Sequence, residues 1–168
     1  MTTPNALLRP ALKMVTAFVA LAVVTLGLTV ITSSASVAQR SMASRWTPAR
    51  YELRVQHWIN KERTDRGLAA LQRVRCAEGT AKNWSHHLVR ADAFYHQDMG
   101  NVLRQCGANY AGETLGKGGI SPFRLVQLWM QSPPHKAVLT SHYPHGIGIG
   151  AVVDSHGQWL TAANFVKL

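Results

Sequence analysis

The sequence is poor in acidic residues, with 8 Asp and Glu against 18 Lys and Arg, which gives a formal net charge of +10 at pH 7. It contains no internal repeat, no low-complexity segment, and neither an HExxH nor a CxxC metal-binding motif. A chain of 168 residues without repeats suits one domain. Because the short motifs are absent, any metal site has to be assembled from residues that lie far apart in the sequence.

The N-terminus has the pattern of an export signal. Residues 1–13 are basic, every residue of 14–31 is apolar, Gly or Thr, and residues 32–38 are small. This order predicts a signal peptide. The apolar run has 18 residues, at the lower edge of what spans a bilayer, so an uncleaved membrane anchor is the alternative. Both place the rest of the chain outside the cytoplasm, because the positive flank stays inside.

Basic charge is concentrated directly after this segment. Residues 39–75 hold nine basic and three acidic residues. This excess favours contact with an anionic surface, such as phospholipid headgroups or wall polymers. The alternative is that the arginines form the solvated face of a helix. We expect no nucleic acid as a partner, because an exported protein seldom meets it and no aromatic and basic motif is present.

Two cysteines, Cys76 and Cys106, complete the unusual composition. In an exported chain they are expected to form a disulfide, because the compartment outside the membrane is usually oxidising. Two separate buried thiols are the alternative. Neither cysteine stands in a recognisable nucleophile context, which disfavours a Cys–His catalytic pair.

Local patterns predict helices first and strands last. A polar linker, residues 39–46, precedes a helix that begins at Thr47-Pro48 and ends at Gly67. The later elements are a helix over 77–91, a loop-rich segment over 92–120 with one short helical turn near Glu113, a helix over 122–131, and a hairpin of strands 147–153 and 158–166. Helices followed by a hairpin suggest an antiparallel sheet covered by helices.

His96, Glu113 and His135 are the candidate functional residues. Each lies beside a predicted helix end or in a glycine-rich segment, where side chains converge on clefts more often than in the middle of helices. Neutral imidazole, carboxylate and water form a plausible ligand set for zinc or a similar divalent ion. The alternative is that these histidines are structural, with their hydrogen bonds satisfied inside the fold.

The order of motifs over residues 51–168 resembles the bacterial branch of the CAP superfamily (cysteine-rich secretory protein, antigen 5 and pathogenesis-related; the SCP domain). The matching segments are WINKERTDRGLAAL, AKNWSHHL, FYHQ, AGETLGKG, LVQLWMQSPPHKAVL, IGIGAVV and GQWLTAANFV. The resemblance implies an α+β fold, a three-layer α-β-α sandwich with a small antiparallel sheet. Residues 47–168 would form this CAP domain, after the export signal or anchor of residues 1–38 and the linker.

The resemblance also implies a cleft lined by two histidines and two acidic residues. His96 takes the position of the first histidine, Glu113 that of the signature-loop glutamate and His135 that of the second histidine. The second acidic position falls at Ser132, which is not acidic. One carboxylate fewer should weaken metal binding, so we expect a divalent metal, zinc before others, held by His96 and His135 at low occupancy.

Two functions follow from these expectations. The first is a secreted, extracellular binding module that has a His/Glu cleft and a basic face for an anionic lipid or cell-wall surface. The second is a metal-dependent hydrolase, with a metal-bound water between His96 and His135 and with Glu113 as the candidate catalytic base. No committed nucleophile is visible in the sequence, which favours the binding module.

Overall fold

The computed structural model describes residues 45–168. The elements follow in the order α2 (Pro48–Thr64), β1 (Gln72–Arg73), α3 (Arg75–Arg90), α4 (Met99–Cys106), β2 (Tyr110–Gly118), α5 (Pro122–Gln131), α6 (Pro133–Leu139), β3 (Gly146–Val153) and β4 (Trp159–Lys167). The predicted export signal or anchor, residues 1–38, lies outside the described residues, as do linker residues 39–44. Within 45–168, no helix has the length and apolar character needed to cross a membrane.

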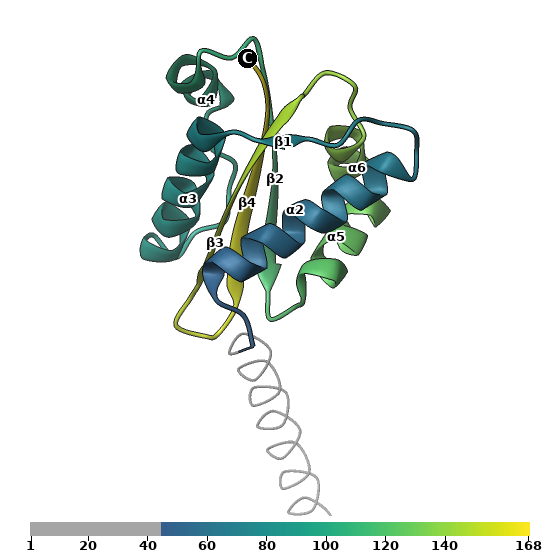
Figure 1. Cartoon of the computed structure of the whole chain (residues 1–168). Coiled ribbons are helices and arrows are strands. Elements are labelled where there is room, and N and C mark those ends of the chain that lie inside the picture. The colour runs from purple at the N-terminus through teal and green to yellow at the C-terminus, as the bar shows by residue number, and fades with distance from the viewer. Residues whose placement is uncertain (1–44) are drawn as a thin grey trace, which may run out of the picture. The chain divides into compact units, whose positions relative to one another are not determined.

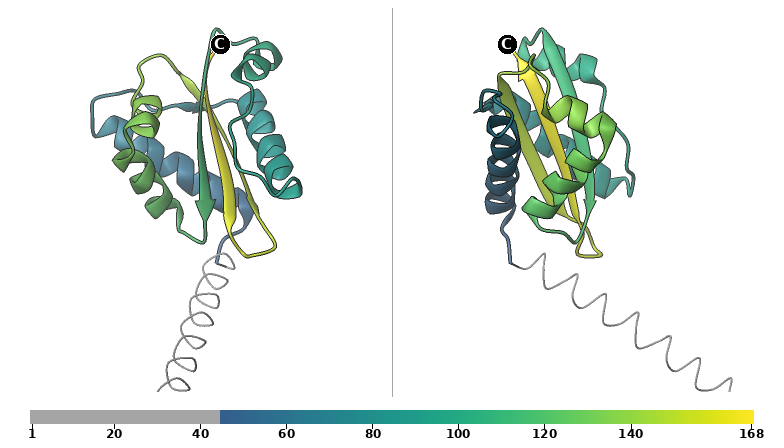
Figure 2. Two further views of the ribbon diagram at one scale, coloured as in Figure 1. Left: turned by 180° about the vertical axis from the view of Figure 1, so that it is seen from behind. Right: turned by 90° about the vertical axis from the view of Figure 1, so that its right-hand side faces the viewer.

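The sheet lies between two layers of helices. Its strand order is β1-β3-β4-β2. Strands β3, β4 and β2 pair antiparallel, whereas the two-residue β1 pairs parallel with β3 at the edge. Helices α3 and α4 cover one face, and α2, α5 and α6 cover the other (Figure 1; Figure 2 shows the same layers from two other sides). The predicted three-layer α-β-α sandwich is therefore confirmed.

Two helices begin with the predicted combination of a capping side chain and a proline. The hydroxyl of Thr47 accepts a hydrogen bond from the backbone N–H of Arg50 at 3.3 Å, and the hydroxyl of Ser121 accepts one from the N–H of Arg124 at 3.3 Å. Proline follows each cap, where its missing N–H has no cost. These local signals fix where α2 and α5 start.

The first helix packs by the face that its periodicity predicts. Tyr51, Val55 and Ile59 are fully buried against the sheet. The Tyr51 ring stacks on Trp159 of β4, with centroids 4.2 Å apart, and its hydroxyl donates to the carbonyl of Ile120 at 3.1 Å. Burying such aromatic and aliphatic side chains contributes on the order of 2 kcal/mol each, which anchors α2 to the sheet.

The prediction for residues 92–120 is wrong in its secondary structure. This stretch contains α4 and the nine-residue strand β2, and Glu113 lies in that strand rather than in a helical turn. The strand is defined by its pairing with β4, which runs over all nine residues from Tyr110↔Lys167 to Gly118↔Trp159. Long-range pairing of this kind leaves little trace in local sequence propensity.

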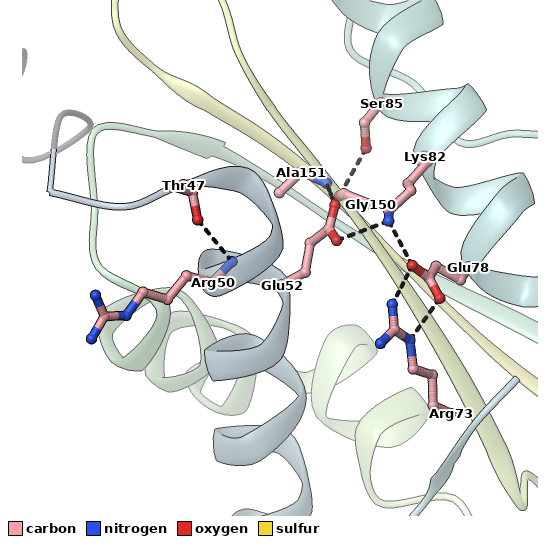
Figure 3. A network of polar contacts seen from close by, with 9 residues as sticks. All are labelled: Thr47, Arg50, Glu52, Arg73, Glu78, Lys82, Ser85, Gly150 and Ala151. Atoms are coloured by element: carbon pink, nitrogen blue, oxygen red, sulfur yellow. Dashed lines mark hydrogen bonds and ion pairs between the residues drawn. The ribbon is translucent and has the colours of Figure 1, made fainter. Parts of the chain in front are cut away.

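The outer edge of β3 is protected by side chains from both helical layers (Figure 3). The backbone N–H of Ala151 donates to the buried carboxylate of Glu52 in α2 at 3.1 Å, and the hydroxyl of Ser85 in α3 donates to the carbonyl of Gly150 at 2.9 Å. Lys82 contacts the same Glu52 carboxylate at 3.2 Å. Because β1 covers only the start of β3, the Glu52 carboxylate satisfies the Ala151 N–H, which would otherwise be open to another strand. The Gly150 carbonyl belongs to the same peptide group and points the other way, toward β4, where Ser85 reaches it from the α3 face.

A chain of charges extends this protection toward β1. Lys82 also contacts Glu78 at 2.5 Å, and Arg73 donates two hydrogen bonds to the Glu78 carboxylate. The hydrogen bonds from Arg73 are the largest cause that lowers the pKa of Glu78, to about 2. Burial raises the pKa of Glu52, and the N–H of Ala151 and the ammonium of Lys82 offset part of that rise. The network joins α2, α3 and β1 around the sheet edge.

Candidate functional site

The candidate site is built on one row of residues that crosses the sheet. Gly148 of β3 pairs with Asn164 of β4, which in turn pairs with Glu113 of β2. Directly paired residues present their side chains on the same face of a sheet. The side-chain amide of Asn164 donates to the Thr80 hydroxyl of α3 at 2.9 Å, so this row faces the layer formed by α3 and α4.

Glu113 is buried, with 7 % of its surface exposed, and both of its carboxylate oxygens are hydrogen-bonded. Nδ1 of His96 lies 2.5 Å from Oε2, and the side-chain amide of Gln97 donates to Oε1 at 2.6 Å. The backbone N–H of Gln97 also donates to Oε2 at 3.3 Å. Burial raises the pKa of Glu113, while the bonds from Gln97 and His96 counteract it. Glu113 thus fixes the segment that carries His96.

Gln97 is the centre of this network, and the sequence analysis did not identify it. Its side-chain N–H group donates to Asn164 at 3.2 Å as well as to Glu113. Asn164 is completely buried, and the hydroxyl of Thr80 that it contacts donates onward to the carbonyl of Ala77. The signal that could have found this network is an asparagine within the apolar strand segment TAANFV, because a buried amide requires partners.

His135 lies on α6, in the helical layer on the opposite side of the sheet. A hydrogen bond of 2.9 Å joins its Nδ1 to the hydroxyl of Ser132. Burial lowers the pKa of His135, and an electrostatic contribution from His96 lowers it further. His96 and Glu113 are in direct contact. A cleft shared by all three side chains stays a prediction.

The predicted disulfide is confirmed. Cys76, at the start of α3, is bonded to Cys106, at the end of α4, with the two Cα atoms 5.5 Å apart. The bond closes a loop that contains both His96 and Gln97. A loop of this length contributes about 3 kcal/mol on the chain-entropy view. The disulfide therefore holds the segment that delivers these two side chains to Glu113.

Comparison with known proteins identifies the family. The model of the cysteine-rich secretory protein family, CAP, matches residues 57–165. The chain belongs to this CAP family. It is 32% identical over 117 residues to the uncharacterized protein YkwD of Bacillus subtilis, an alignment that covers 65% of this chain and 45% of that protein. The chain therefore spans less than half the length of this curated relative.

Solved structures share the CAP fold at low sequence identity. An outer surface protein of Borrelia burgdorferi is 22% identical with a TM-score of 0.62, over 67% of this chain and 88% of the other. An extracellular protein of Bacillus anthracis that contains an SCP domain is 18% identical with a TM-score of 0.65, over 72% of this chain and 41% of the other. These likenesses support the fold.

This CAP domain does not present a complete metal site in the part that the structure describes. No group of three or more His, Cys, Asp or Glu side chains there is arranged to hold an ion. Both oxygens of Glu113 are engaged by Gln97 and His96, and Ser132, where the resemblance implied a second acidic residue, is a serine that bonds to His135. Two imidazoles fall short of the three or four protein ligands that zinc takes. The side chains as arranged do not fit a tightly held ion.

Proposed function

We propose that this protein is an extracellular binding module that attaches to an anionic lipid or cell-wall surface through the outer face of α2. The relatives named above as an outer surface protein and an extracellular protein support the location. The single observation that carries the proposal is a set of arginines on and beside α2 that have no acidic partner among residues 45–168.

Almost all acidic residues of the described chain are already paired with basic residues other than these arginines. Seven of them lie within 4 Å of a basic side chain: Glu52, Glu62, Asp65, Glu78, Asp98, Glu113 and Asp154. Arg45, Arg50, Arg54 and Arg124 are exposed and form no ion pair with a described residue. Their charge is therefore available to a partner.

Aromatic and aliphatic side chains lie among these arginines. Arg54 lies over the ring of Trp58, 5.6 Å from its centroid, and Trp58 packs at 4.7 Å on Phe123 of α5. Phe123 and Leu53 are 42% and 55% exposed. Phe123 lies outside the buried face of α5, which Leu125, Val126 and Trp129 form. A surface that combines arginines with exposed apolar groups suits the interface of a membrane.

Sedimentation of the full-length protein with vesicles tests the proposal. We expect binding to vesicles containing phosphatidylglycerol, weaker binding at high salt, and little binding to pure phosphatidylcholine. The double variant Arg50→Ser/Arg54→Ser should reduce partitioning by about thirtyfold, since each basic residue near an anionic surface contributes about 1 kcal/mol. Purified cell walls in a parallel assay distinguish a wall polymer from a lipid as the source of charge.

The matched control is Arg75→Ser/Arg90→Ser, which removes the same charge from α3 in the other layer. Both of these arginines are exposed and form no ion pair with a described residue. Both double variants keep the N-terminal segment, so a difference between them isolates the α2 face. Equal losses in the two variants would mean that net charge alone drives binding, and salt-insensitive binding would contradict the electrostatic proposal.

Zinc binding by His96 and His135 is a second, separate proposal. Because Glu113 is already engaged, we expect weak affinity, with water completing the coordination. Titration of zinc into untagged wild-type protein and into His135→Ala measures this affinity. Equal affinity in the two proteins would exclude a zinc site that contains His135. Hydrolysis would require turnover of a defined substrate that is lost in Glu113→Gln while the fold is kept.

A further inference from the structure

A hollow lies between α3 and α4, and Gln97 is one of the residues that line it. It has a volume of about 300 Å³. Four side-chain amides and one indole ring dominate its lining: Asn83, Gln97, Asn101, Gln105 and Trp84. No lysine, arginine or aliphatic side chain lines it. Its one carboxylate, Asp98, already caps α4 by accepting from the N–H of Gly100 at 2.8 Å. Thr80 and His87 complete the lining, which combines amide and hydroxyl groups with aromatic rings.

The amides present both donors and acceptors to this space. Asn83 and Gln105 form no side-chain hydrogen bond with another residue of 45–168. Gln97 uses its N–H group on Glu113 and Asn164, which leaves its carbonyl oxygen as an acceptor. The carbonyl of Asn101 accepts from Arg104, which leaves its N–H group as a donor. An amide lining of this kind suits a ligand that carries many hydroxyl or acetamido groups.

Trp84 is held in a fixed orientation beside these amides. Its indole N–H donates to the carbonyl of Tyr95 at 3.1 Å, and its ring stacks on His87 with centroids 4.7 Å apart. The Tyr95 hydroxyl in turn lies 2.7 Å from Nε2 of His87. Because the ring is already fixed before binding, the entropic cost of binding a ligand against it is lower. Trp84 is only partly buried, so part of its side chain is open to a ligand.

We propose that the hollow between α3 and α4 binds a neutral carbohydrate of one or two sugar rings. Its volume lies at the lower end of the range for small-molecule sites. The absence of lysine and arginine argues against phosphate or carboxylate ligands, which these two side chains normally recognise. The imidazole of His87, which also lines the hollow, already lies 2.7 Å from the Tyr95 hydroxyl. The absence of aliphatic side chains argues against a lipid tail. Amides with an aromatic ring match the alternating hydroxyl and C–H surfaces of a sugar.

The hollow is linked to the candidate site through one residue. Gln97 lines the hollow, and its side-chain N–H group donates to Glu113. A sugar hydroxyl that bonds to Gln97 would therefore contact a side chain that is itself bonded to Glu113. Sugar binding does not depend on the arginines of α2, which lie in the opposite layer. If attachment through α2 were disproved, the sugar-binding proposal would be unaffected, and the reverse also holds.

Titration of the full-length protein with N,N′-diacetylchitobiose and with cellobiose, followed by calorimetry, tests the proposal. We expect saturable millimolar binding of at least one disaccharide, without competition by inorganic phosphate. Asn83→Ala and Asn101→Ala should each weaken binding by about fivefold, the equivalent of one lost hydrogen bond. Asn109→Ala, an exposed asparagine outside the hollow, is the matched control and should change the affinity less than twofold.

Arg50→Ser/Arg54→Ser should retain full sugar binding, which separates this proposal from attachment through α2. Several results would overturn it: no saturable binding of either disaccharide at tens of millimolar sugar, equal affinity in the two hollow variants and wild type, or displacement by phosphate. Circular dichroism of each variant establishes that a lost affinity does not reflect a lost fold.

Discussion

Gly148→Ala should disrupt the layer that supports the candidate site. Gly148 lies in the row with Asn164 and Glu113, directly beneath α3. A Cβ atom at this position would lie 1.9 Å from the backbone nitrogen of Glu78 and 2.1 Å from the carbonyl carbon of Ala77. Both contacts are with helix backbone, which cannot rotate away as a side chain can.

The size of the effect follows from this geometry. Ordinary contact begins at 3.4 Å, so α3 would have to move away from the sheet by about 1.5 Å. That movement would open the packing of Ala77, Ala81 and Leu88, all of them essentially fully buried. Overpacking costs 1–3 kcal/mol where side chains can adjust. Because backbone cannot adjust here, we expect a loss of about 3 kcal/mol or more in the free energy of unfolding.

Urea unfolding followed by circular dichroism measures the loss, and Gly79→Ala is the matched control. Gly79 lies within α3, and a Cβ there would meet nothing within 4 Å. An alanine at that position should raise stability by about 0.5–1 kcal/mol, because glycine is a poor helix former. If Gly148→Ala fell within 1 kcal/mol of wild type, the account of how closely α3 lies on the sheet would be refuted.

Two further predictions concern charged residues outside the site. Arg63 is 2% exposed and donates to the carbonyls of Ala69, Leu139 and Ser141 at 2.8–2.9 Å. The variant Arg63→Met should therefore lower the free energy of unfolding, measured in urea, by about 3 kcal/mol. The variant Arg63→Lys should recover little of this loss, because one ammonium group cannot satisfy all three carbonyls. The pKa of Glu78 is lowered to about 2, so its contribution to stability is present above its ordinary pKa of 4.5 and is lost as the pH falls toward 2. Unfolding measured from pH 6 to pH 2 should show a shallower decline in Glu78→Gln than in wild type, and identical slopes would contradict this.

The elements with strong local signals could be predicted from the sequence. The cap and proline pairs gave the starts of α2 and α5, and the spacing of Tyr51, Val55 and Ile59 gave the buried face of α2. The final hairpin was also predicted to within one residue at each end. In each case the determinant lies within one turn or a few residues of chain, where sequence patterns are informative.

Strand β2 could not be predicted, because its determinants lie elsewhere in the chain. Its sequence YAGETLGKG contains three glycines and no valine or isoleucine. Gly116 has to be small since a Cβ there would lie 2.4 Å from the Leu125 side chain of α5. The strand therefore results from nine pairings with β4 and from close packing by α5, neither of which is visible in a local window.

In the candidate site, the titratable residues could be predicted from the sequence, whereas the neutral residues could not. His96 and Glu113 could be nominated because titratable groups in a glycine-rich segment stand out, and the structure places them 2.5 Å apart. Gln97 and Asn164 lie within the matching segments FYHQ and GQWLTAANFV, but they carry no charge and were not chosen as candidates; each contacts two other members of the network. Neutral amides are effective here because they satisfy a buried carboxylate without adding a second charge that would itself need desolvation. For this site, His96 and Gln97 hold Glu113 only once the fold has brought the segment between α3 and α4 against β2 and β4.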